Sequence, residues 1–75
     1  MILPDKHISL GNSLLGGASV MLRKLRYPRT VSRLWHNVRT VKEIGSFQRF
    51  ALILDFLFAL GLIELKQGML QRRII

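Results

Sequence analysis

Apolar residues recur with helical spacing along most of this chain. In its first third they occur at steps of four, three and four: Leu14, Ala18, Met21 and Leu25. Such spacing predicts the apolar stripe of an amphipathic helix. The preceding residues 11–13, Gly-Asn-Ser, are typical of a loop that ends in a helix cap. We therefore expect the first helix to begin directly after them.

Two neighbouring glycines, Gly16 and Gly17, stand near the start of this helix. Glycine destabilises a helix by roughly 0.8–1 kcal/mol relative to alanine. Their presence predicts close packing of another segment against the helix at this point. The helix is expected to end at Tyr27 and Pro28, because proline cannot continue it.

Two further helices follow, each behind a residue suited to capping. We expect Thr30 to cap the second helix, whose apolar residues fall at i, i+3, i+4, i+7 and i+10: Val31, Leu34, Trp35, Val38 and Val41. Ser46 is expected to cap the third helix. Gly61 is a natural residue to end it, with Leu62 placed to fold back on its last turn.

The apolar pattern changes after Gly61 from helical to alternating. The segments LIEL and MLQRR flank residues 66–68, Lys-Gln-Gly, which predicts a β-hairpin. A lone hairpin is unstable in water, so we expect it to pack on the helices or to pair with an N-terminal strand, MIL, before Pro4. The predicted fold is therefore a mostly helical α+β winged helix-turn-helix, in which residues 1–75 form one domain.

The most apolar stretch, FALILDFLFALGLIEL from Phe50 to Leu65, begins in the third helix and has Asp55 inside it. A bilayer span needs ~20 apolar residues, and an acid at its centre costs about 2.5–3.5 kcal/mol. The stretch is too short and too interrupted for a membrane span. The N-terminus lacks the pattern of a signal peptide, and with no cysteine we expect a cytoplasmic protein.

The two sides of the third helix are both largely apolar. At about 100° per residue, the predicted core stripe is Phe47, Phe50, Ala51, Leu54, Leu57 and Phe58. The opposite side carries Gln48, Arg49, Leu52, Ile53, Phe56, Ala59 and Leu60. Monomers rarely expose a large apolar patch, so we predict that a partner protein binds at Leu52, Ile53, Phe56 and Leu60. The alternative is that the N-terminal strand and the hairpin cover both sides.

Charge adds a second expectation about partners. The 75 residues carry a formal charge of +8, and 49% of them are apolar. A basic chain of this kind is expected near an acidic protein surface, nucleic acid or anionic lipid. The candidates for sequence-neutral contact with double-stranded DNA are Arg29, Arg33, Arg39, Arg49, Lys66, Arg72 and Arg73. An acidic patch on a protein partner would explain the same residues.

No pattern for catalysis, metal binding or a cofactor stands out in the sequence. It has four acids, two well-separated histidines (His7 and His36) and no cysteine, and it lacks the HExxH, Walker and GxGxxG motifs. We therefore expect a protein that is not an enzyme and has no cofactor. Trp35 is expected in the core, and Asp55 is expected in an ion pair with Lys6, His7 or an arginine of the first helix.

Several segments taken together resemble a known bacterial family. MILPDKH, SLLG, TVSRLW and the apolar stretch followed by a glycine turn are similar, in the same order, to middle component 6 of ABC-three-component systems. The resemblance implies a small subunit of a Lamassu-like anti-phage or anti-plasmid defence complex. It also implies two partners from the same operon, an SMC- or Rad50-like ATPase and a nuclease-type effector.

Two other functions remain open from the sequence. A small winged-helix transcriptional regulator would bind a palindromic operator, although only Gln48 and Arg49 of the third helix are suited to reading bases. A basic membrane-active peptide would lie in the bilayer interface. The capped helices and the hairpin turn favour a folded domain over such a peptide.

Overall fold

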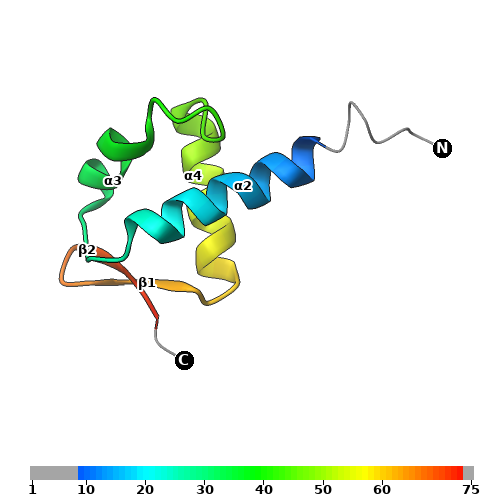
Figure 1. Ribbon diagram of the computed structural model, residues 1–75. Coiled ribbons are helices and arrows are strands. Elements are labelled where there is room, and N and C mark those ends of the chain that lie inside the picture. Colours follow the sequence, from blue (N-terminus) through cyan, green and yellow to red (C-terminus); the bar gives the residue numbers. More distant parts are fainter. Residues whose placement is uncertain (1–8, 74–75) are drawn as a thin grey trace.

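The computed structural model describes residues 9–73, with side chains from residue 14 onward. Within that range three helices precede a two-stranded antiparallel hairpin: α2 (Ser9–Lys24), α3 (Val31–Val38), α4 (Phe47–Ala59), β1 (Ile63–Lys66) and β2 (Met69–Arg72) (Figure 1). This is the mostly helical, winged-helix-like arrangement that the sequence predicts. The expected N-terminal strand falls outside the described residues.

Helix α2 begins earlier than expected. Residues 11–13 lie inside it, because the helix starts at Ser9, so the prediction of a loop there was wrong. Intrinsic propensity is a weak signal that context often overrides. Helix α2 crosses α4, and the hairpin lies beside the end of α2 and the end of α4 (Figure 1).

The paired glycines lie where α2 meets the rest of the domain. A Cβ on Gly17 would collide with Cδ1 of Ile53 and stand 3.3 Å from the carbonyl oxygen of Glu43. Gly17 therefore allows α2 to approach both α4 and the connection before it. The close packing predicted from the glycine pair is confirmed.

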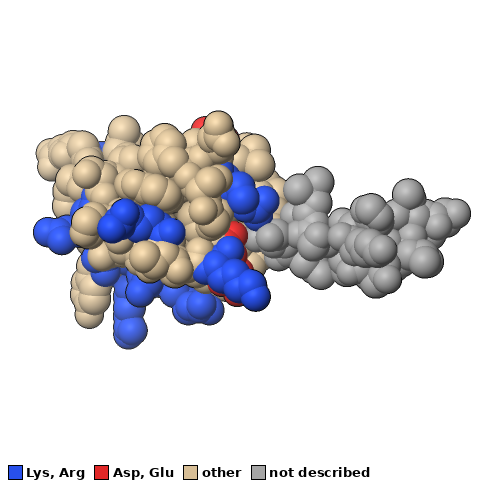
Figure 2. All heavy atoms as spheres, turned by 90° about the horizontal axis from the view of Figure 1, so that it is seen from above, with Lys and Arg blue, Asp and Glu red and all other residues tan. Residues whose placement is uncertain are grey.

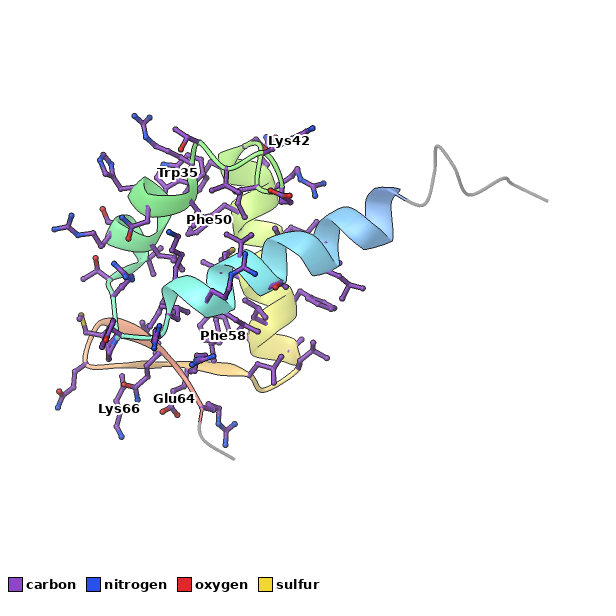
Figure 3. The ribbon with its side chains drawn as sticks, in the orientation of Figure 1. Trp35, Lys42, Phe50, Phe58, Glu64 and Lys66 are labelled. Carbon is purple, nitrogen blue, oxygen red and sulfur yellow. The ribbon has the colours of Figure 1, made fainter. Side chains whose placement is uncertain are left out.

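Helix α3 is short and has the predicted cap. The Oγ1 of Thr30 accepts a hydrogen bond of 3.1 Å from the backbone N–H of Arg33. The helix ends at Val38. Val41 therefore lies in the α3–α4 connection, although its spacing had placed it on the helix. Trp35 packs between α3 and α4 with its ring centroid 5.2 Å from those of Phe47 and Phe50 (Figure 3).

The hairpin turns through Gln67 and Gly68, which both have positive φ, 54° and 79°, as a type I′ turn requires. A third segment pairs with it. Arg29, in the α2–α3 connection, and Leu70, in β2, exchange backbone hydrogen bonds of 3.0 and 2.6 Å. The hairpin is thus stabilised by a bridge that the sequence analysis did not predict.

One cluster of buried side chains joins all these elements. Ile44 and Leu70 extend it from the helices into the α3–α4 connection and the hairpin. The buried members are Ala18, Met21, Leu25, Leu34, Val38, Ile44, Phe50, Ile53, Leu54, Leu57, Ile63 and Leu70. The core is therefore closed by the hairpin at one end, and α4 runs along it.

Candidate interaction surface

Helix α4 is held at both ends by local hydrogen bonds. The Oγ of Ser46 accepts from the backbone N–H of Arg49 at 3.2 Å. At the other end Gly61 has a φ of 72°, and Leu62 donates to the carbonyl of Leu57 at 3.0 Å while Gly61 donates to that of Phe58 at 2.9 Å. These two bonds form a Schellman motif. Both predicted ends of the helix are confirmed.

The buried side of α4 differs from the predicted one. Phe50, Leu54 and Leu57 are in the core as expected, but Ile53, predicted to face a partner, is fully buried. Ile53 is buried because α2 packs on that side, where Gly17 leaves room for its side chain. Ile53 therefore does not belong to an interaction surface.

Two residues that were predicted to lie in the core are exposed instead. Phe47 has 54% of its surface exposed and Phe58 has 40%. The buried stripe is thus displaced around the helix toward Ile53, and the side that contains Phe58 is left to solvent. Phe47 still contacts the ring of Trp35.

The remaining residues predicted for partner binding lie on the surface. Leu52 is 51% exposed and Leu60 is 55% exposed, while Phe56 is half-buried and packs against the core. These three residues are four positions apart, so they lie along one side of α4. We call Leu52, Phe56 and Leu60 the α4 ridge.

A groove of about 310 Å³ runs between α2 and α4 beside this ridge. Ala18 and Leu57, which are both buried, contribute to its lining. The full lining is Leu15, Ala18, Ser19, Leu22, Arg23, Phe56, Leu57, Leu60, Leu62 and Arg72. We call this the α2–α4 groove. It adds exposed apolar surface from α2, above all Leu15, to that of the ridge.

Asp55 does not make the ion pair that was expected for it with α2. Its side chain is exposed, and no salt bridge forms among residues 14–73. Since the buried side of α4 is turned toward Ile53, Asp55 faces water and needs no partner. Lys6 and His7, the other expected partners, fall outside the described residues.

Two of the arginines predicted to contact DNA hold the domain together instead. The guanidinium of Arg29 donates to the carbonyl of Lys24 at 2.6 Å and to Oδ1 of Asn37 at 2.9 Å. Arg49 donates from Nε to the carbonyl of Ile44 at 3.2 Å. Both side chains are partly buried, so they are engaged by the fold.

The other predicted DNA-contacting residues, Arg33, Arg39, Lys66, Arg72 and Arg73, are exposed. Seen from above, Lys and Arg lie mostly along one side of the visible face, with little Asp or Glu among them (Figure 2). Lys66 extends from the hairpin away from the helices (Figure 3). These cations are spread over α3 and the hairpin and do not form a single compact site.

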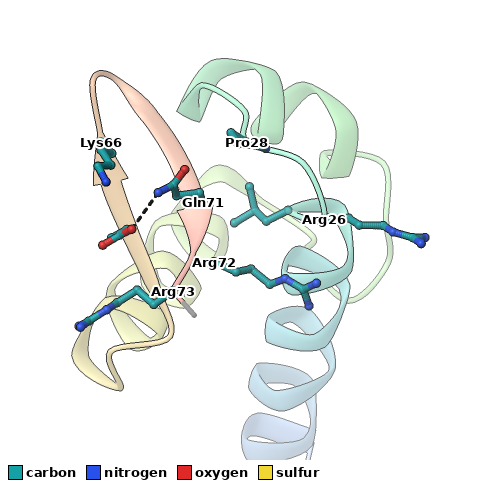
Figure 4. Close-up of a pocket in the computed structure, with 8 residues that line it drawn as sticks. Arg26, Pro28, Lys66, Gln71, Arg72 and Arg73 are labelled. Carbon is teal, nitrogen blue, oxygen red and sulfur yellow. Dashed lines mark hydrogen bonds between the residues drawn. The ribbon is translucent and has the colours of Figure 1, made fainter. Parts of the chain in front are cut away.

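A second hollow, of about 530 Å³, separates the hairpin from the end of α2. It is lined by Arg26, which the sequence analysis did not single out for DNA contact, and by Lys66, Arg72 and Arg73, among others. The guanidinium groups of Arg26, Arg72 and Arg73 point in different directions, and Gln71 donates to Glu64 at 2.8 Å (Figure 4). The cations therefore do not converge on one bound anion.

The part of the chain that the structure describes contains no group of three or more His, Cys, Asp or Glu residues placed to hold a metal ion. His36 is exposed on α3, and His7 lies outside the described residues. None of the helices within residues 9–73 has the length and apolar character needed to cross a membrane.

Two features of this surface escaped the sequence analysis. Leu15, the neighbour of Leu14 in the predicted stripe of α2, is 60% exposed and lines the α2–α4 groove. The structural role of Arg29 was also missed. A signal for it was present in the sequence, because an arginine between two helices can reach the free carbonyls at the end of the first.

Comparison with known proteins gives one match. No curated protein and no solved structure matches the chain. The family model of the ABC-three component (ABC-3C) system middle component 6 matches residues 3–73, which is nearly the whole sequence. The chain therefore belongs to the middle component 6 family of ABC-three-component systems.

Proposed function

We propose that this protein is a non-catalytic small subunit of a bacterial defence complex directed against phages or plasmids. It docks through the α4 ridge onto a partner subunit of the same system. The partner is the SMC- or Rad50-like ATPase or the nuclease-type effector that a Lamassu-like system contains. Membership of the middle component 6 family supports a role among partner proteins.

The observation that carries this proposal is the apolar exposed side of α4. In a helix-turn-helix protein the second helix of the motif reads bases with polar side chains. Here that position is occupied by α4, whose outward residues include Leu52, Asp55 and Phe58. Gln48 is exposed, whereas Arg49 is bound to Ile44. An acid and apolar side chains fit a protein surface better than a major groove.

Sequence-neutral contact with DNA is a second part of the proposal. The exposed cations Arg33, Arg39, Lys66, Arg72 and Arg73 are joined to no acid within residues 14–73. Such residues contact phosphates without reading sequence, and their contribution weakens as salt is added. Within a complex they would hold DNA beside the partner subunit. A sequence-specific regulator is disfavoured because, of the two residues of α4 suited to reading bases, Gln48 is exposed and Arg49 is bound to Ile44.

The test is co-expression of the tagged chain with the products of the neighbouring genes. The native chain should co-purify with at least one of them. Leu52→Asp should leave the chain folded, because exposed substitutions usually cost within about 0.5 kcal/mol, but should abolish co-purification. Arg33→Glu, an exposed change on α3, is the matched control and should leave assembly intact. If the native chain purifies alone, the proposed function is wrong.

The DNA part is tested on the assembled complex by the salt dependence of its affinity for duplex DNA. Changing Lys66 and Arg73, which do not line the α2–α4 groove, together to Glu should weaken binding and flatten the dependence on salt. Assembly should survive, because both side chains are exposed on the hairpin. Loss of the complex would instead identify the hairpin cations as protein contacts.

A further inference from the structure

The α2–α4 groove combines an apolar interior with a positive rim. Leu15 and Leu22 of α2 face Phe56 and Leu60 of α4 across it. Leu15 and Leu60 remain more than half exposed. A groove between two helices with apolar walls is the surface into which an amphipathic helix commonly binds, through anchors at i, i+3, i+4 and i+7.

The charges at the groove are of one sign. Arg23 of α2 and Arg72 of β2 line it, both with exposed side chains, and no acid is among its lining residues. Arg23 belongs to α2 and Arg72 to β2, so the two arginines come from two different elements. In the ribbon α2 crosses α4, and the hairpin lies beneath the lower end of α4 (Figure 1). A ligand with apolar anchors and negative charge on its flanks complements this arrangement.

We propose that the α2–α4 groove binds an amphipathic helix of a partner protein that carries acidic residues beside its apolar stripe. The inference rests on the proposed function and adds the chemistry of the segment that docks. Its leucine-like anchors would fill the space between Leu15 and Leu60. Its carboxylates would meet Arg23 and Arg72 at the rim, where partial exposure favours orientation and specificity over raw affinity.

A second copy of this chain fits the groove poorly. The chain carries a formal charge of +8, so two copies repel one another. Of its three acids within residues 14–73, Glu64 is hydrogen-bonded to Gln71. Only Glu43 and Asp55 of these could then meet the arginines of a second copy. A docked copy would place cations against the positive rim. An acidic partner removes this repulsion.

The experiment uses the full chain and two synthetic helical peptides with leucine at i, i+3, i+4 and i+7. One peptide has glutamate on both flanks of the leucine stripe and the other has lysine. Binding is measured by fluorescence anisotropy at physiological salt. We expect the glutamate peptide to bind at least about ten-fold more tightly than the lysine peptide, because only its charges complement the rim.

Two pairs of variants locate the binding. Leu60→Asp should weaken binding of the glutamate peptide at least about ten-fold, because it removes an apolar anchor. Leu65→Asp is its control, since Leu65 on the hairpin has 56% exposure against 55% for Leu60 and the added charge is the same. Arg23→Glu should reverse the preference toward the lysine peptide. Arg33→Glu, with the same change of charge on α3, should not.

Several results would overturn the inference. These are equal binding of the two peptides, equal loss in Leu60→Asp and Leu65→Asp, and equal effects of Arg23→Glu and Arg33→Glu. Dimers of the native chain in sedimentation equilibrium that Leu60→Asp dissociates would identify a second copy as the occupant. Anionic vesicles that compete with the glutamate peptide for the native chain but not for Leu60→Asp would identify a lipid surface instead.

The same variants separate this inference from the proposed function. Leu52 lies on the α4 ridge but does not line the groove. If Leu52→Asp abolishes co-purification and Arg23→Glu leaves it unchanged, the docking function stands and the groove inference fails. If no neighbouring product co-purifies with the native chain, the proposed function fails, whatever the peptides show.

Discussion

Helices α3 and α4 both begin at a hydroxyl cap and pack on the same core, but their outer sides are opposite in character. The exposed side of α3 carries Ser32, Arg33 and His36, whereas that of α4 carries Leu52, Asp55 and Phe58. A polar outer side needs no cover. The apolar outer side of α4 is costly for an isolated domain. Under the proposed function, the outer side of α3 needs no cover and the partner subunit covers the outer side of α4.

The largest expected effect comes from a charge placed on the inner side of α4. Leu54 is 9% exposed, so Leu54→Asp buries an unpaired carboxylate at about 3–5 kcal/mol. A core of this size supplies about 3–5 kcal/mol in total, and the variant should be unfolded by circular dichroism. Leu52→Asp, two residues away on the outer side, should stay folded. Unfolding of both variants would mean that α4 has no side exposed to solvent.

Removal of a buried apolar side chain should lower the free energy of unfolding by a similar amount on both helices. Ile53→Ala on α4 and Leu34→Ala on α3 both empty fully buried positions, and each should lower the free energy of unfolding by about 2–5 kcal/mol in urea titrations. Phe58→Ala removes a larger side chain, yet it should cost only about 0.5 kcal/mol because its site is exposed. A large effect at Phe58 would contradict the assignment of the two sides.

The contact of α2 with α4 gives a smaller effect. In Gly17→Ala the new Cβ collides with Ile53, and such overpacking costs about 1–3 kcal/mol. Gly16→Ala is the matched change, because its Cβ would lie 3.3 Å from Cγ of the exposed Glu43 side chain, which can move. Gly16→Ala should therefore be neutral or stabilising in the same titration. Equal losses would show that α2 is not fixed by Gly17.

The smallest effect tests what the two helices share. Thr30→Ala and Ser46→Ala each remove one hydroxyl that accepts a backbone N–H. Each should lower the midpoint of urea unfolding by an amount that corresponds to about 1 kcal/mol. Restoring the cap with Thr30→Ser or Ser46→Thr should recover most of the loss. A much larger loss at one helix would show that its cap has a further role in packing.

The contrast between the helices also explains how far the sequence could predict the molecule. The caps of α3 and α4, the hairpin turn and the burial of Leu34 and Val38 follow from local chemistry, and they are confirmed. The predicted buried side of α4 was wrong because apolar residues occur around most of that helix. Its orientation depends on where α2 approaches, which is a tertiary contact made at Gly17.

The basic residues show the same limit. Arg29 and Arg33 were both predicted from the sequence to contact DNA. In the structure Arg29 is hydrogen-bonded to Lys24 and Asn37, whereas Arg33 has an exposed side chain. Charge predicts that a residue prefers the surface or a partner, but it does not predict which carbonyl it will reach. The groove rim likewise brings together Arg23 and Arg72, which are far apart in the chain.

The bridge between Arg29 and Leu70 has a consequence for how the domain is made. Leu70 follows α2, α3 and α4 in the chain, so these three helices are synthesised before the residue that fills the buried site of Leu70. Until then the apolar side chains of α4 have no closed core to join, and an emerging chain exposes them on both sides. Pairing of the late strand with the early Arg29 therefore completes the core on the inner side of α4. Under the proposed function, the partner subunit covers the outer side.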